Sequence, residues 1–146
     1  MAENIPVCAV GAIVLEKGEL LLVKRDREPA RGLWSLPGGR VIWGESLMEA
    51  CAREVREETG IDVDIEGLAG IAERIIPDDD GRVLFHFVIH DFWAKPRAHD
   101  VRPGDDVSDA RWVNVADLGS LPLSEGLLEF LQDRGALEGR RPRVRA

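Results

Sequence analysis

The sequence contains no tyrosine, only two cysteines, and no apolar run close to the roughly 20 residues that a membrane-spanning helix needs. Cys8 and Cys51 are too few for a disulfide framework or a paired metal motif, so we expect two small buried thiols in a reducing compartment. Basic residues are outnumbered, with 19 Lys and Arg against 27 Asp and Glu, and the formal net charge is -8. This balance excludes the basic surface that general binding to nucleic-acid polymers requires.

The N-terminus also lacks the basic region of a secretory signal, since residues 1–6 read Met-Ala-Glu-Asn-Ile-Pro. We therefore expect a soluble, cytoplasmic protein that contacts no membrane. A small anionic substrate stays compatible with the acidic composition, provided that a cation accompanies it. A monomer and a homodimer both stay open.

The residues that are present predict one α/β domain. At 146 residues, 45% hydrophobic and 32% charged, the chain is long enough to enclose a single core. Apolar runs at 7–15 and 20–23 flank a Lys-Gly-Glu turn and indicate a β-hairpin. Further extended segments are expected at 62–76, 82–93 and 110–113, joined by a turn at 77–81 and a loop at 95–109.

Two helices complete the pattern. The first is predicted for 47–59, where Ser46 and Glu49 form a capping box and Gly60 suits the C-terminal cap. The second, 125–134, is capped by Ser124 and turns Leu127, Leu128, Phe130 and Leu131 inward. The connections predict a mixed sheet with helices on its faces. This domain is expected to span residues 1–136, and residues 137–146 form a basic tail, expected to be a solvated terminus.

Three glutamates lie on an unexpected face of the first helix. At about 100° per residue, Glu54, Glu57 and Glu58 fall within an arc of about 100°. They share this arc with apolar residues nearer the N-terminus (Leu47, Ala50, Cys51), while the opposite side carries Glu49, Ala52, Arg56 and Thr59. A simple solvated acidic stripe would lie on that polar side instead.

The charge of these glutamates also needs a partner. Carboxylates in the last turns oppose the helix dipole by about 0.3–1 kcal/mol each and raise one another's pKa. Arg53 is placed to pair with Glu49 and Glu57 at four-residue spacing, but one arginine does not neutralise three carboxylates. An all-oxygen ligand set selects Mg²⁺ or Mn²⁺ over zinc. A helix stabilised by ion pairs alone is the alternative.

The segment that contains this helix resembles a Nudix box. Gly39, five residues, Glu45 and seven further residues precede Arg53-Glu54-Val55-Arg56-Glu57-Glu58-Thr59-Gly60-Ile61, and all nine specified positions of the 23-residue motif match. The flanking strands, the Gly-Leu-Trp-Ser-Leu-Pro-Gly-Gly entry and the terminal helix also resemble the family over about residues 5–134. The resemblance implies a Nudix-type α/β/α sandwich with a central mixed sheet. It also implies a hydrolase that cleaves a diphosphate linked to another moiety, using Mg²⁺ or Mn²⁺.

By the same resemblance, Glu54, Glu57 and Glu58 are the catalytic carboxylates and metal ligands, helped by the Gly38 carbonyl. Arg53 holds the loop and orients the glutamates with Glu45 as its partner, while Gly39 and Gly60 are structural positions of the box. The metal neutralises and orients the diphosphate and activates a water. The general base is either a box glutamate or a carboxylate of the late loop, such as Asp105 or Asp106, which are equally ordinary turn residues.

The choice of substrate depends on residues outside the box. In ADP-ribose pyrophosphatases a proline commonly follows the box by about fifteen residues, and Pro77 stands sixteen after Ile61, although proline is also ordinary turn chemistry. Dinucleoside-polyphosphate hydrolases often carry a downstream tyrosine, which this chain lacks, and GDP-mannose hydrolases usually lack an intact box. The expected reaction is therefore hydrolysis of ADP-ribose to AMP and ribose 5-phosphate. A triphosphatase of the 8-oxo-dGTP type stays open, as do a non-catalytic nucleotide-binding module and a diphosphate isomerase, which usually resemble the box less well.

Several residues outside the box are candidates for contact with this nucleoside diphosphate derivative. Arg25 and Arg31 flank the entry to the box and either hold phosphate or are solvated loop cations. Trp43, Phe87 and Trp93 either stack on a base or belong to the core. His86 and His90 share one face of a strand without an acidic neighbour at ligand spacing, so we expect them to pack or line the surface.

Overall fold

The computed structural model of the protein describes residues 4–138, so residues 139–146 of the expected basic tail lie outside the described residues. Seven strands, two α-helices and two short 3-10 helices (η) follow one another along this part of the chain. In order they are β1 (Val7–Glu16), β2 (Glu19–Arg25), β3 (Trp34–Ser35), β4 (Gly38–Arg40), α1 (Leu47–Thr59), β5 (Val63–Pro77), β6 (Val83–Pro96), β7 (Val107–Asn114), η1 (Val115–Ser120), α2 (Leu127–Asp133) and η2 (Ala136–Glu138).

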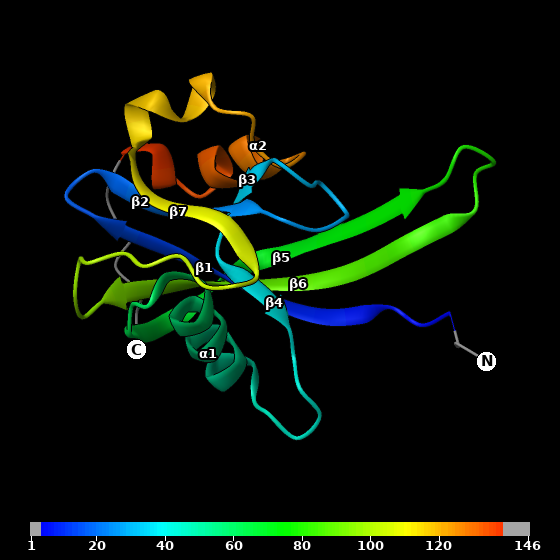
Figure 1. The fold of residues 1–146 in the computed structure, drawn as a ribbon, viewed down its shortest axis with the longest axis horizontal. Coiled ribbons are helices and arrows are strands. Elements are labelled where there is room, and N and C mark those ends of the chain that lie inside the picture. The colour runs from blue at the N-terminus through cyan, green and yellow to red at the C-terminus, as the bar shows by residue number, and fades with distance from the viewer. Residues whose placement is uncertain (1–3, 139–146) are drawn as a thin grey trace.

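A mixed sheet forms the centre of the molecule (Figure 1). Its strand order is β3-β2-β1-β6-β5, with β4 paired to β1 and β7 paired to β2. β1 and β6 run parallel, and the other strand pairs are antiparallel. α1 lies on one side of the sheet and α2 on the other (Figure 1). The expected α/β/α sandwich with a central mixed sheet is therefore confirmed.

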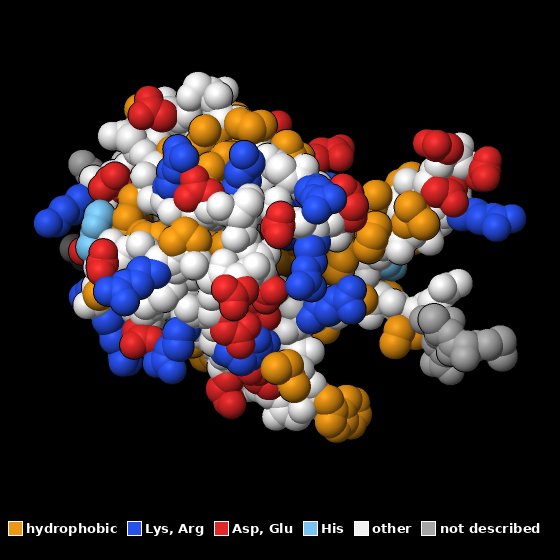
Figure 2. Space-filling model, viewed as in Figure 1, with side chains coloured by type: hydrophobic (Ala, Val, Ile, Leu, Met, Phe, Trp, Pro, Cys, Tyr) orange, Lys and Arg blue, Asp and Glu red, His pale blue; other side chains and the backbone are white. Residues whose placement is uncertain are grey.

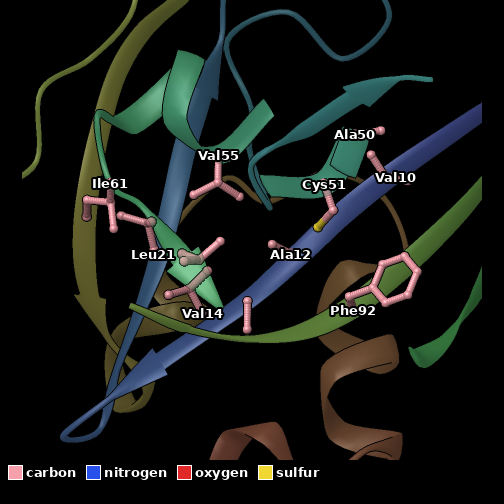
Figure 3. Close-up of a cluster of buried hydrophobic side chains, with 11 residues drawn as sticks. Val10, Ala12, Val14, Leu21, Ala50, Cys51, Val55, Ile61 and Phe92 are labelled. Carbon is pink, nitrogen blue, oxygen red and sulfur yellow. The ribbon is translucent and has the colours of Figure 1, made fainter. Parts of the chain in front are cut away.

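Two buried clusters hold the layers together. The first joins α1 to the sheet through residues that include Val10, Ala12, Cys51 and Val55 (Figure 3). The second lies on the α2 side and includes Ile13, Trp93 and Leu131. Neighbouring residues of β1 alternate between the two clusters because side chains alternate along a strand. Both faces of the central strands are thus covered, which explains their nearly continuous apolar sequence.

α1 has the predicted bounds and caps. The Glu49 N–H donates to the Ser46 hydroxyl at 3.1 Å, and Gly60 ends the helix in the left-handed conformation. The prediction for Thr59 is wrong, because this residue is fully buried rather than on the polar side. Its hydroxyl donates to the Val55 carbonyl at 2.6 Å and accepts the Ile61 N–H at 3.3 Å, so burial leaves it satisfied. The buried face of α1 is therefore centred nearer to Val55 than the spacing suggested.

Other boundaries also differ from the prediction. β6 ends at Pro96 and β7 begins at Val107, so the loop between them covers only 97–106. α2 begins at Leu127 after Gly126 in the left-handed conformation, with no side-chain cap, so the assignment of Ser124 as the cap is wrong. Cys51 is buried as expected, but Cys8 is exposed. Cys8 lies near the start of β1, which extends beyond the part of the sheet that α1 covers (Figure 1).

β5 and β6 form a long hairpin that projects beyond the body of the molecule (Figure 1). Its register shifts at two places near its base, between Ile65 and Gly67 and between Leu68 and Gly70. On its α1 side, His86 Nε2 lies 3.7 Å from Glu73 Oε1, so the acidic neighbour that the spacing did not show comes from the paired strand. No helix within residues 4–138 combines the length and the apolar character needed to cross a bilayer.

Candidate active site

Arg53 joins the loop before α1 to the glutamates of the helix. Its Nε and Nη2 donate to the two carboxylate oxygens of Glu45 at 2.6 and 2.9 Å. Its Nη1 donates to Glu54 at 2.9 Å and to Glu57 at 3.2 Å, and its Nη2 also reaches the Arg40 carbonyl at 3.0 Å. The pairings with Glu57 and Glu45 are as expected, whereas Glu54 takes the place expected for Glu49. The Arg53 hydrogen bonds hold the pKa of Glu45 below its ordinary value.

β4 begins with two glycines, Gly38 and Gly39, which lie where the helix glutamates meet the sheet. The Gly38 N–H donates to Glu58 Oε1 at 2.6 Å. A Cβ on Gly39 would lie only 2.6–2.7 Å from the atoms of the Glu54 carboxylate. Gly39 therefore leaves room for the Glu54 carboxylate, and Gly38 leaves room for the β1 backbone, where a Cβ would collide with the Val10 carbonyl oxygen. Figure 2 shows acidic side chains gathered over α1 and β4, with basic side chains beside them.

Two of these carboxylates are held against their ionised form. Burial raises the pKa of Glu58 to about 8, while the Gly38 N–H opposes that rise and the Glu54 carboxylate adds to it. Burial likewise raises the pKa of Glu54, and the Arg53 guanidinium opposes the rise. Glu57 is more open, with 51% of its side chain exposed. The site thus concentrates negative charge where solvent does little to stabilise it.

A divalent cation fits this site by the chemistry of its donors. Carboxylate oxygens of Glu58 and Glu54 lie beside the backbone of Gly38 and Gly39, Glu57 shares the Arg53 guanidinium with Glu54, and oxygen ligands suit Mg²⁺ and Mn²⁺. Within residues 4–138, no three acidic, histidine or cysteine side chains are grouped as a ready-made metal site. Arg53 holds Glu54 and Glu57, and the Gly38 N–H holds Glu58, so these carboxylates are directed to protein partners. Binding a cation would require them to turn away from those partners.

Two arginines from distant strands lie beside this acidic site. Arg25, at the end of β2, is half-buried, and burial lowers the pKa of its guanidinium while Glu58 opposes that change and Arg74 adds to it. The interpretation of Arg25 as a solvated loop cation is therefore wrong. Arg74, on β5, donates to the Glu125 carbonyl at 2.8 Å. Sequence analysis missed it, although a single cation between Ala72 and Ile76 on one face of an apolar strand was a usable signal.

The loop 97–106 returns to the C-terminal end of α1. The Arg102 N–H donates to the Thr59 carbonyl at 2.8 Å and the Gly104 N–H to the Glu58 carbonyl at 3.0 Å, so the loop satisfies carbonyls that the helix end leaves free. This contact brings Asp106 close enough to raise the pKa of both Glu54 and Glu58. Asp106 also pairs with Arg27 at 3.2 Å. Its neighbour Asp105 is exposed.

The remaining candidates lie in three different settings. Arg31 is exposed in the loop between β2 and β3. Trp43 is fully exposed in the loop between β4 and α1, and Trp93 is 4% exposed and belongs to the core on the α2 side. Phe87 is partly exposed on β6, stacks on Phe85 with ring centres 5.8 Å apart, and is the cross-strand partner of Arg74. Of these four, Phe87 shares a sheet face with a charged neighbour of the acidic site.

Comparison with known proteins gives this arrangement a family. A model of the NUDIX domain matches residues 6–133, which include every box residue described above. The chain belongs to the Nudix family. It is 35% identical over 117 residues to the ADP-ribose pyrophosphatase of Methanocaldococcus jannaschii, covering 80% of this chain and 65% of that protein. It is 35% identical over 74 residues to human 8-oxo-dGDP phosphatase NUDT18, covering 51% of this chain and 23% of that protein.

Among solved structures, this Nudix chain is similar to the MutT NUDIX hydrolase from Burkholderia pseudomallei. The TM-score is 0.76 at 30% identity, with 88% of this chain and 98% of that chain covered. The first curated relatives are longer proteins, since the chain spans between about half and two thirds of their length. The family and the fold are therefore shown.

Proposed function

We propose that the protein is a divalent-metal-dependent pyrophosphohydrolase of nucleoside diphosphate derivatives, and that ADP-ribose is its substrate, hydrolysed to AMP and ribose 5-phosphate. The observation that carries the hydrolase assignment is the box helix itself. Glu54, Glu57 and Glu58 stand on one side of α1, tied by Arg53 and the β4 backbone, and burial holds Glu58 against ionisation unless a cation binds beside it. The similarity to an ADP-ribose pyrophosphatase over 80% of the chain supports the substrate.

Each part of the site has a role in this reaction. When bound, the divalent cation neutralises the diphosphate and activates the attacking water. Glu54, Glu57 and Glu58, with the Gly38 carbonyl, would hold it. Arg53 positions the glutamates, and Arg25 and Arg74 supply positive charge for the substrate's phosphates. The general base is a carboxylate in contact with this cluster, for which Glu58 and Asp106 are the candidates.

Pro77 adds less to the substrate assignment than its spacing suggested. It ends β5 at the tip of the projecting hairpin, away from α1 (Figure 1). The substrate proposal therefore rests on the sequence relative and on the face of the sheet beside Arg74 and Phe87. The expectations of a cytoplasmic location and of a homodimer stay predictions.

An oxidised-nucleotide phosphatase is the second candidate, favoured by the similarity to 8-oxo-dGDP phosphatase over the region of the box. A non-catalytic module is less well supported, because every box position keeps its residue. The two enzymes differ in their products. ADP-ribose yields AMP and ribose 5-phosphate. An oxidised nucleotide yields its nucleoside monophosphate together with phosphate or pyrophosphate.

The deciding experiment incubates the purified protein with Mg²⁺ and equal concentrations of ADP-ribose, 8-oxo-dGTP and 8-oxo-dGDP, and separates the products by chromatography. Glu58→Gln, which keeps the shape of the site and removes a carboxylate, serves as the control for contaminating activity. We expect kcat/KM to be highest for ADP-ribose, by about tenfold or more, a ratio typical of pocket discrimination. A tenfold preference for either oxidised nucleotide would overturn the substrate, and equal rates for the control would overturn the site.

A further inference from the structure

Asp91 is a buried acid that the reaction described above does not use. It lies on β6 between Ile89 and Trp93 on the sheet face toward α2, and its residue exposure is 5%. Its neighbours across the sheet are Gly11 on β1 and Gly70 on β5. A Cβ on Gly11 would collide with the Asp91 carboxylate, so this side chain lies over the glycine rather than over a neighbouring side chain.

The Asp91 carboxyl has no protein partner of its own. No residue within 4–138 donates a hydrogen bond to it, and no cation in that range lies within ion-pair distance. Arg134 is the cation that acts on it, and it lowers the pKa that burial raises to about 7. Arg134 is itself fixed elsewhere, because it donates to the carbonyls of Ala69 and Phe130 at 3.0 and 3.1 Å. The Asp91 oxygens are not sealed from solvent, so a group from outside the chain can reach them, and a donor bound there would offset the cost of burying the carboxyl.

The position of Asp91 connects it to the candidate active site. Gly11 pairs with Gly38 of β4, whose N–H binds Glu58, so Gly38, Gly11 and Asp91 form one row across three adjacent strands. Adjacent strands lie about 4.8 Å apart, so the Asp91 backbone lies about 10 Å from the Gly38 backbone, two strands away. Its carboxylate leans back over Gly11, toward that site.

The sheet face changes character at Asp91. On one side along β6, Trp93 is 4% exposed and packs in the core on the α2 side. On the other side, Ile89 and Phe87 face the same way and are partly exposed. Asp91 therefore stands where the covered core gives way to an open apolar face. A flat nucleoside suits such a face, with apolar contacts for the base and few fixed polar groups for its donors.

We propose that Asp91 is a specificity-determining residue that accepts a hydrogen bond from a neutral donor on the nucleoside half of the substrate, an O–H of the ribose or an N–H of the base. This inference rests on the proposed function, because it takes the diphosphate to lie at Glu58 and Arg25. The nucleoside then extends along the row from Gly38 over Gly11 to Asp91. Phe87 and Ile89 provide the apolar surface beyond it, and Arg134 keeps its backbone partners.

The test compares affinities for AMP and three analogues that each lack one donor, measured by calorimetry with Mg²⁺ on the wild type. The analogues are 2′-deoxy-AMP and 3′-deoxy-AMP for the ribose hydroxyls and purine riboside monophosphate for the 6-amino group. We expect one of them to bind at least about tenfold more weakly than AMP, the effect of losing a hydrogen bond to a charged group. The analogue that fails identifies the donor. Equal affinities for all four ligands, or no measurable binding of AMP, would overturn the proposal without any variant.

Variants at Asp91 separate this role from a structural one. Asp91→Leu removes the acceptor with little change of shape, and it should erase the tenfold discrimination while the melting temperature in the absence of ligand stays level or rises. Asp91→Asn keeps one acceptor oxygen and should restore part of the discrimination. Asp117→Asn, an exposed site in η1, is the matched control and should change neither. If Asp91 instead anchors α2 through Arg134, Asp91→Leu will lower the melting temperature and leave the discrimination intact.

The outcome is distinguishable from failure of the proposed function. Binding of AMP and its analogues requires no hydrolysis, so discrimination at Asp91 can be present in a protein that does not cleave ADP-ribose. Conversely, cleavage of ADP-ribose with equal affinity for all four ligands would retain the proposed function and refute the role of Asp91.

Discussion

Replacing Glu58 with glutamine in the metal-free protein should stabilise the fold, and the gain should depend on pH. Burial raises the pKa of Glu58 from 4.5 to about 8, whereas the unfolded chain keeps the ordinary value. Between these pH values the folded protein retains a proton that the unfolded chain has released, so the free energy of unfolding falls as the pH rises. Glutamine has nearly the same shape, keeps an oxygen for the Gly38 N–H, and does not titrate.

The size of the gain follows from the shift. At about 1.4 kcal/mol per pKa unit, a rise from 4.5 to about 8 corresponds to roughly 5 kcal/mol as an upper bound. The Glu58 side chain is not fully enclosed, and water that enters the metal-free site screens part of this penalty. We therefore expect a gain of about 2 kcal/mol above pH 8, which is roughly 4–8 °C in melting temperature for a chain of this size. Near pH 5 the two proteins should melt together.

The measurement is a series of thermal melts from pH 5 to pH 9 in EDTA, for the wild type, Glu58→Gln and the control Glu49→Gln. Glu49 is an exposed residue in the first turn of the same helix, so its replacement tests the effect of lost charge alone. A difference between the Glu58 variant and the wild type that does not change with pH would refute the electrostatic reasoning. A variant that melts below the wild type at pH 8.5 would show that Glu58 stabilises the fold through its charge.

Three further results are expected from the same site. EDTA should abolish hydrolysis and Mg²⁺ or Mn²⁺ should restore it, so full activity in EDTA would refute the metal assignment. Glu57→Gln should lower kcat by about 10²-fold or more, and Mg²⁺ should raise the melting temperature of this variant less than that of the wild type. Arg53→Ala should lower both kcat and melting temperature because it releases the loop and the helix glutamates together, and Arg53→Lys should recover little of either, since a single ammonium does not span these acceptors. Gly39→Ala should lower kcat by displacing the Glu54 carboxylate, which lies 2.6–2.7 Å from the added Cβ, while circular dichroism stays unchanged.

The parts of the site that the sequence predicted correctly depend on local geometry. The bounds and both caps of α1 follow from Ser46 and Gly60, which act within one helical turn of the ends. The pairing of Arg53 with Glu57 follows from four-residue spacing on a single helix, whereas Glu54 takes the place that the same spacing gave to Glu49. Glu45 needed the family resemblance, because its pairing with Arg53 depends on the path of a loop. Thr59 was misplaced because spacing fixes the relative angles of side chains but not which angle faces the sheet.

The parts that the sequence did not predict depend on contacts between distant segments. Arg25 and Asp106 come from β2 and the loop before β7 and approach the glutamates only through the fold, and Arg74 of β5 in turn lies close enough to act on Arg25. Counting alternate residues along β5 also fails near its base, because the first register shift exchanges the faces of the strand and the second restores them a few residues later. Such shifts reflect sheet twist and packing, which leave no fixed sequence pattern.

Charge distribution then explains why these distant residues belong together. Burial moves the pKa of Glu54, Glu58 and Asp91 upward and that of Arg25 downward, so each group is held against its ionised form. Arg53 stabilises the acidic side only in part, because its donors are shared among three carboxylates. Such groups lower the stability of the empty protein. A cation held by the glutamates would reverse the effect on Glu54 and Glu58, an anionic ligand would reverse the effect on Arg25, and a neutral hydrogen-bond donor would reverse the effect on Asp91. Stability that is absent without ligand is then available as binding free energy, and this is the physical reason to propose that the acidic helix, Arg25 and Asp91 are parts of one site.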